Sequence, residues 1–75
     1  MTQRGVILFH TNSAVFQAEK VLGKAGLSVK LVPTPRQFSS DCGIALQFDW
    51  EQSRLVEEEL DKAKVEIADM KSVLS

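Results

Sequence analysis

The spacing of apolar and polar positions changes several times along the chain, and each change marks an expected element. The run Gly5–Phe9 is apolar throughout and β-branched at its centre, which predicts a central strand covered on both faces. From residue 14 the apolar side chains recur at helical spacing, directly after three good N-cap residues, so residues 14–25 are expected to form an amphipathic helix. Gly26 suits the left-handed position at which many helices end.

A second and a third strand are expected next. Residues 29–32 alternate weakly and are rich in β-branched side chains, which is typical of a strand. A strand, a helix and a strand in this order normally form a right-handed βαβ unit whose two strands run parallel. After a loop that holds both prolines, Ile44, Leu46 and Phe48 alternate along one face of a third strand, which is expected to run back antiparallel.

The last third of the chain allows two interpretations. Asp49, with Gln52 three residues later, fits the start of a second helix with a capping box. Apolar residues then recur every four or three positions without an intervening glycine or proline: Val56, Leu60, Ala63, Ile67, Met70 and Leu74. One long helix with a coiled-coil seam, through which the chain could form a homodimer, would explain this spacing. Alternatively, the helix ends near Ala63, and residues 65–67 and 71–74 are extended segments, one of which forms an edge strand.

Together these elements predict one α+β domain over residues 1–75, a βαββαβ (ferredoxin-like) sandwich of two helices on a mixed sheet. The alternative fold has three strands and one long C-terminal helix. The formal net charge of −1 gives no electrostatic reason to expect binding to nucleic acid or to an anionic membrane. No apolar run reaches the length of a membrane span, and we expect the protein in the cytoplasm.

The loop between the second and third expected strands holds the best candidate for chemistry, Cys42, which is the only cysteine of the chain. The thiolate is the nucleophilic form of cysteine, and cations and helix N-termini lower its pKa. The expected topology brings Cys42 to one sheet edge with the first helix turn and with two supporting candidates, Arg36 and His10. The alternatives are a buried structural cysteine, a solvated arginine and a histidine engaged in local hydrogen bonds.

Other kinds of site find no support in the residues. One cysteine and one histidine fall short of the three or four protein ligands of a zinc site, so no metal is expected. There is no glycine-rich phosphate loop, and no cofactor is expected.

Several segments resemble one family of small proteins. They are Val6–His10, Glu19–Leu22 followed by Ala25-Gly26, Leu31–Arg36 with its Pro-x-Pro-Arg pattern, and Asp41–Leu46 with its Cys-Gly pair. Over about residues 5 to 70 the chain is similar to the selenium/sulfur carrier-like proteins, a family whose function is not established. Ala63-Lys64 departs from the Ala-Gly pair that usually precedes the last extended segment of the family.

The resemblance implies a role for Cys42, which matches the cysteine of the family. That role is to carry a persulfide or perselenide from a cysteine desulfurase or a selenocysteine lyase to an acceptor protein, as a covalent carrier rather than an enzyme that turns over alone. Phe16, off the apolar stripe of its helix, is expected to be exposed, and Phe38 to pack. The alternatives are a small interaction or dimerisation module with a structural cysteine, and a thiol redox sensor.

Overall fold

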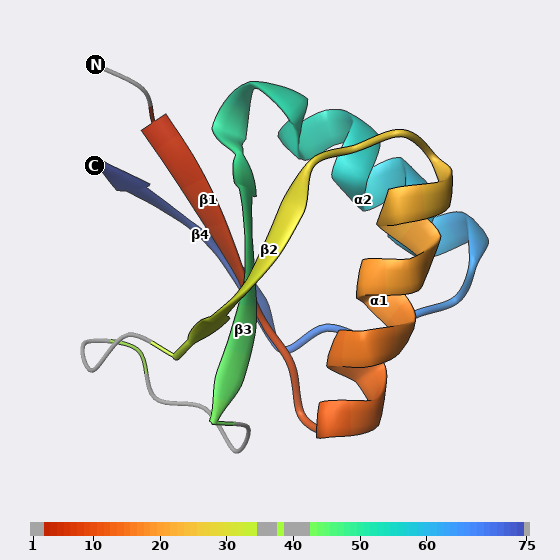
Figure 1. The fold of residues 1–75 in the computed structure, drawn as a ribbon, viewed down its shortest axis with the longest axis horizontal. Helices are drawn as coiled ribbons and strands as arrows, with labels where there is room; N and C mark the ends of the chain where they lie inside the picture. The colour runs from red at the N-terminus through yellow and green to blue at the C-terminus, as the bar shows by residue number, and fades with distance from the viewer. Residues whose placement is uncertain (1–2, 35–37, 39–42, 75) are drawn as a thin grey trace.

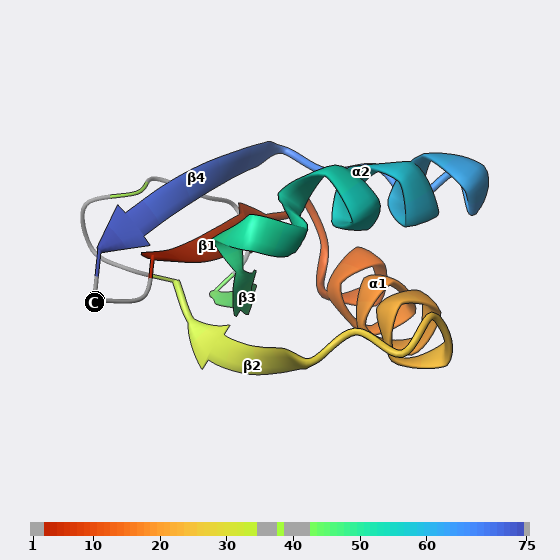
Figure 2. The same ribbon diagram turned by 90° about the horizontal axis from the view of Figure 1, so that it is seen from above.

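The computed structural model describes residues 3–34, 38 and 43–74. Its elements are β1 (Gln3–Leu8), α1 (Asn12–Lys24), β2 (Val29–Pro33), β3 (Ile44–Asp49), a 3₁₀ turn (Trp50–Gln52), α2 (Ser53–Lys62) and β4 (Asp69–Leu74). The four strands form one sheet in the order β2-β3-β1-β4. Both helices lie on the same side of this sheet, as Figure 1 and Figure 2 show. The described chain is therefore a small α+β structure with one layer of helices and one layer of strands.

All neighbouring strands of the described sheet are antiparallel, so the expectation of a mixed sheet is wrong. β1 and β2 do run in the same direction, as expected for strands joined through a helix, but β3 lies between them. In the same way β1 lies between β3 and β4. Because each crossover through a helix skips one strand, hydrogen bonds join only strands of opposite direction.

The alternative of one long C-terminal helix is also wrong. α2 ends at Lys62, and Lys64 adopts a left-handed conformation with a φ of 57°. The backbone N–H groups of Lys64 and Val65 donate to the carbonyl oxygens of Asp61 and Leu60, at 3.1 and 3.0 Å, which is the pattern of a Schellman helix ending. The chain then forms β4, which pairs with β1. This ending removes the continuous helical seam through which a homodimer was expected.

Replacing Lys64 with glycine is expected to raise the free energy of unfolding by about 1 kcal/mol. A side chain in the left-handed conformation costs roughly 1–2 kcal/mol, and the greater freedom of glycine in the unfolded chain offsets part of the gain. α1 ends in the same pattern with a glycine, Gly26, at this position, where φ is 82°. Urea denaturation of Lys64→Gly measures the gain, and Gly26→Lys is the matched control, which should lose stability. Two unchanged unfolding curves would contradict this account of the helix endings.

The two helices begin differently. α1 starts as expected, because Oγ1 of Thr11 accepts a hydrogen bond of 3.2 Å from the N–H of Ala14. The capping box expected for the second helix is wrong: neither Asp49 nor Gln52 makes a side-chain cap hydrogen bond, and the 3₁₀ turn precedes α2. Oε1 of Gln52 is instead buried with no hydrogen-bond partner. Packing of α2, rather than its cap, therefore holds its start in place.

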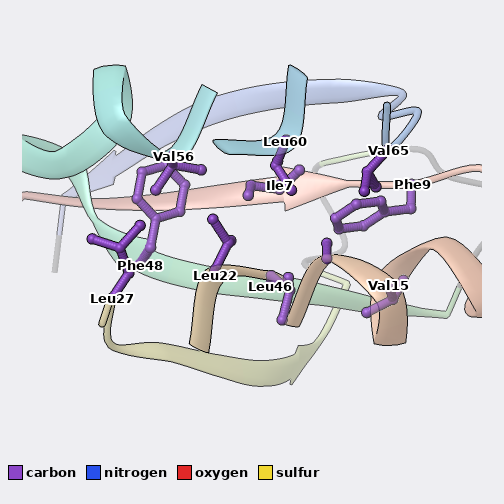
Figure 3. Close-up of a cluster of buried hydrophobic side chains, with 11 residues drawn as sticks. Ile7, Phe9, Val15, Leu22, Leu27, Leu46, Phe48, Val56, Leu60 and Val65 are labelled. Atoms are coloured by element: carbon purple, nitrogen blue, oxygen red, sulfur yellow. The ribbon is translucent and has the colours of Figure 1, made fainter. Parts of the chain in front are cut away.

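The main hydrophobic core lies between the sheet and the two helices, as Figure 3 shows. Its buried members come from the helix-facing side of the sheet, from both helices and from the segments that follow them: Ile7, Phe9, Val15, Ala18, Leu22, Leu27, Leu46, Phe48, Val56, Leu60 and Val65. Strand side chains alternate, so the residues between these point to the outer face of the sheet, away from the helices. Three of them, Val6, Leu8 and Ala45, are also buried, and we call them the outer-face cluster.

Candidate functional site

One end of the sheet gathers the segments that the sequence linked to chemistry. Ile7 pairs with Leu46 and Pro33 pairs with Ile44, so the carboxyl ends of β1 and β2 lie beside the start of β3. α1 begins at the same end, shortly after β1 (Figure 1). β4 starts there too, because Asp69 pairs with Leu8. These backbone segments converge as expected from the βαβ topology.

Of the three candidate site residues, only His10 belongs to the described part of the chain. It is exposed and lies at the junction between β1 and α1. Arg36 and Cys42 lie outside the described residues, so their contacts stay predictions. The N–H of Thr34 donates to the carbonyl oxygen of Gly43 at 3.1 Å, which joins the described chain on either side of them. Because Cys42 immediately precedes Gly43, this bond marks where the thiol-bearing segment enters the sheet.

The N-terminus of α1 gives this end of the sheet a favourable environment for an anion. α1 has 13 residues, and its first turn contains no acidic side chain that would offset the positive end of the helix dipole. Oγ1 of Thr11 caps this turn by accepting from the N–H of Ala14. An anion held close to this turn, such as a thiolate or a persulfide, would therefore be stabilised.

An ion pair at this end was not singled out from the sequence. Nζ of Lys71 lies 3.0 Å from a carboxylate oxygen of Asp69, and both side chains are about half exposed. The hydrogen bond from Lys71, with another of 2.8 Å from the N–H of Met70, lowers the pKa of Asp69 below its usual value. Exposed pairs of this kind contribute little to stability. The pair depends on a β4 strand that the spacing of apolar residues could not distinguish from a helix.

Phe38 links the segment between β2 and β3 to the outer face of the sheet. Its half-buried side chain packs, together with Val32 and Val73, against the outer-face cluster. The expectation that Phe38 packs is confirmed. Phe16 on α1 is 51% exposed, which confirms the other expectation. The outer face is therefore covered in part by a residue only four positions before the cysteine.

Replacing Phe38 with alanine is expected to lower the free energy of unfolding by about 1–2 kcal/mol, less than the roughly 3–5 kcal/mol of a fully buried phenylalanine. It would also uncover the outer-face cluster, so binding of a hydrophobic dye to the folded protein should increase. Phe16→Ala is the matched control, because the exposed Phe16 should change stability by no more than about 0.5 kcal/mol. Equal effects of the two substitutions would contradict the packing of Phe38.

A shallow hollow of about 340 Å³ lies toward the opposite end of the sheet. It is lined by residues at the start of β1 and β2 and at the end of β3: Arg4, Ser28, Val29, Lys30, Gln47, Phe48 and Asp49. The sequence alone did not link Arg4 and Lys30 to a site, and Asp49 was expected at the start of a helix. The hollow is separate from the end of the sheet at which Gly43 leads into β3.

The described residues contain no group of three or more histidine, cysteine, aspartate or glutamate side chains that could hold a metal ion. None of the helices among them is long and apolar enough to cross a membrane.

Comparison with known proteins identifies the family. No curated protein and no solved structure matches the chain. The family described as "Putative Se/S carrier protein-like" matches residues 4–72, nearly the whole chain. Every described helix and strand lies within this range except Gln3 of β1 and Val73 and Leu74 of β4. This is the family that the Pro-x-Pro-Arg segment and the Cys-Gly pair resemble. The chain therefore belongs to the Se/S carrier protein-like family.

Proposed function

We propose that the protein is a sulfur or selenium carrier, which accepts a persulfide or perselenide on Cys42 and passes it to an acceptor protein. The observation that carries this proposal is the family match over residues 4–72 in a chain with a single cysteine. A cysteine desulfurase or a selenocysteine lyase is the proposed donor. The protein acts as a covalent carrier rather than as an enzyme on its own, in a reducing compartment such as the cytoplasm.

The transfer step is balanced without an external oxidant or reductant. The thiolate of Cys42 attacks the terminal sulfur of a persulfide on the donor. A new S–S bond forms at Sγ of Cys42 while the S–S bond of the donor breaks, and the donor cysteine leaves as a thiolate. Delivery repeats the same exchange, with the acceptor thiolate as the nucleophile and Cys42 as the leaving group. A perselenide follows the same course with selenium as the transferred atom.

The surroundings of the cysteine support this chemistry. The N-terminus of α1 lies at the end of the sheet where Gly43, the neighbour of Cys42, precedes β3. Its positive dipole favours the thiolate and the persulfide anion. In the proposal, Arg36 adds a positive charge and His10 accepts the proton of the thiol. A small body with a shallow hollow suits a protein that docks with a donor and an acceptor in turn.

The fold assignment completes the proposal. The strand order β2-β3-β1-β4, with both helices on one side, supports a ferredoxin-like βαββαβ arrangement that forms a single domain over residues 1–75. In this arrangement the loop that holds Cys42 connects an edge strand to an inner strand.

Loading by a donor enzyme tests the proposal. The protein is incubated with a cysteine desulfurase and cysteine, or with a selenocysteine lyase and selenocysteine, and its intact mass is recorded without reductant. We expect a gain of one sulfur or one selenium atom, and the better substrate identifies the cargo. No gain with either donor, together with a Cys42 that is alkylated only after unfolding, would contradict the carrier and favour an interaction module.

A further inference from the structure

The outer face of the sheet has an apolar half and a polar half, and the polar half holds two cations and the carboxylate of Asp49. The Lys71–Asp69 ion pair of β4 lies on the same face, opposite Val6 and Leu8. The outer-face cluster, covered in part by Phe38, forms the apolar half. On the same face, further along the strands, lie Arg4 of β1 and Lys30 of β2, which both line the hollow of about 340 Å³. Arg4 and the cluster residue Val6 are two positions apart in β1, so their side chains point to the same face of the sheet. The hollow therefore directly borders the apolar half.

The register shows how the polar groups of the hollow are arranged. Lys30 pairs with Gln47, and Gln47 pairs with Val6 on the other side of β3. Arg4 pairs with Asp49, the one carboxylate among the described residues that line the hollow. Diagonal neighbours on one face of a sheet are about 7–8 Å apart, so Gln47, opposite Lys30, and Asp49, opposite Arg4, both lie between the two cations. One ligand could contact Arg4, Lys30 and Gln47.

The two cations of the hollow are not engaged in ion pairs with other described residues, whereas Lys71 pairs with Asp69 and Lys62 pairs with Glu59. Arg4 and Lys30 are both exposed. A guanidinium group binds a carboxylate through two parallel hydrogen bonds, and an ammonium group beside it adds a second charge. Two cations against the one carboxylate of Asp49 leave the hollow with a net positive charge, which favours a carboxylate ligand.

The helix layer has the opposite charge. Four of the ten residues of α2 are acidic and two, Arg54 and Lys62, are basic. Glu57, Glu58 and Asp61 are exposed, whereas Glu59 is half-buried and pairs with Lys62. The whole chain has a formal net charge of −1, so the cationic hollow is a local feature rather than a consequence of the composition. An acidic partner would be repelled by α2 and steered toward the outer face of the sheet.

We propose that the hollow docks an acidic, partly apolar segment of the protein that gives or receives the cargo; this inference rests on the proposed carrier function. Carboxylates of the segment bind Arg4 and Lys30, the amide of Gln47 donates a further hydrogen bond, and an apolar residue reaches the edge of the outer-face cluster. This docking holds the partner on the outer face of the sheet. Phe38, four positions before Cys42 in the sequence, packs on the same face. A second copy of the chain, docking through its acidic α2, would instead build an open-ended head-to-tail assembly.

A titration with a defined peptide tests the docking surface. The probe is the acetylated and amidated peptide Glu-Leu-Glu-Glu-Leu, added to isotope-labelled protein while backbone amide shifts are recorded, and a peptide with lysine in place of glutamate is the control. We expect shifts at residues lining the hollow, and weaker binding at high salt. Lys30→Glu and Arg4→Gln should each weaken binding by roughly tenfold. Lys20→Glu, a matched charge reversal on exposed α1, should leave it within about twofold.

The contrary results are clear. Shifts spread over the surface, or an equal loss of binding in Lys30→Glu and Lys20→Glu, would overturn the proposal. Concentration-dependent assembly of the wild type that Lys30→Glu abolishes would also overturn it, because the occupant would be a second copy. Alkylation of Cys42, measured without any donor, should be the same in Lys30→Glu and wild type. If the protein binds the peptide but is never loaded, the docking surface is supported and the carrier function is refuted. If the protein is loaded but does not bind the peptide, the carrier function is supported and the docking surface is refuted.

Discussion

The Cys42→Ser variant is expected to lose all loading with sulfur or selenium while it keeps the fold. The serine hydroxyl is nearly the same size as the thiol, but it does not form the thiolate that attacks the sulfur of a persulfide. The chain has no second cysteine that could accept the cargo instead. Because the two side chains are close in volume, thermal unfolding should change little. Intact mass after incubation with a donor enzyme, and circular dichroism of both proteins, measure the two effects.

A second cysteine variant provides the matched control. Lys24 is the exposed last residue of α1 and does not line the hollow, so Lys24→Cys in the Cys42→Ser background offers an accessible thiol at the opposite end of this helix from its N-terminus. We expect this thiol to be alkylated readily but loaded by the donor at least tenfold more slowly than Cys42, because its pKa stays near the roughly 8.5 of a free cysteine. Equal loading of the two thiols would show unspecific exchange and would contradict a specialised site.

Replacing Gly5 with alanine is expected to lower the free energy of unfolding by about 1–3 kcal/mol. Gly5 is buried in β1 opposite Phe48 of β3, and the ring of Phe48 lies across it. A β-carbon at Gly5 would stand only 2.6 and 2.8 Å from Cε1 and Cε2 of that ring. The ring cannot move freely, because Phe48 is 3% exposed and its centroid lies 6.0 Å from that of Trp50. Urea denaturation measures the loss.

Gly23→Ala is the control for this substitution. Gly23 lies in α1, and a β-carbon there would meet no other atom within 4 Å. Alanine favours a helix over glycine by roughly 0.5–1 kcal/mol, so this variant should be at least as stable as the wild type. Two glycine-to-alanine changes in one chain are thus expected to act in opposite directions. If Gly5→Ala were as stable as Gly23→Ala, the close approach of Phe48 to β1 would be wrong.

The features that could be predicted from the sequence are those in which a local pattern has one physical explanation. The apolar run before His10 had to be a strand covered on both faces, and it is the inner strand β1. Gly26 was expected to end α1, and the hydrogen bond of 3.0 Å from the N–H of Leu27 to the carbonyl of Leu22 is that of a Schellman ending. The exposure of Phe16 also followed from helical periodicity alone.

The errors arose where the same pattern fits two structures. The apolar spacing after Val56 continues across the end of α2. The apolar residues of the following segment happen to fall at the same three- and four-residue intervals that one face of a continuous helix would have. The residue that ends this helix is Lys64, which gives no signal in the sequence, since left-handed lysine is unfavourable. The error of a mixed sheet likewise concerns long-range pairing, because it is the direction of neighbouring strands that differs. Two parallel strands joined by a helix do not reveal that β3 lies between them.

The candidate site shows the same limit. The sequence was enough to direct attention to Cys42 and to the end of the sheet at which its segment enters. It could not reveal the covered outer face, because the contact of Phe38 with the outer-face cluster joins residues far apart in the chain. Nor could it reveal the hollow, where Arg4 and Lys30 come together only through the register of three strands.

The most direct test of the central claim is to follow the cargo on Cys42 itself. Protein loaded by the donor enzyme is separated from it and digested with trypsin, which releases residues 37–54 as one peptide that contains Cys42. We predict that the added sulfur or selenium is found on this peptide alone, and that it disappears when an acceptor thiol is added before digestion, as the acceptor gains the same atom. An added atom on any other peptide, or one that the acceptor thiol does not remove, would contradict a carrier that works through Cys42.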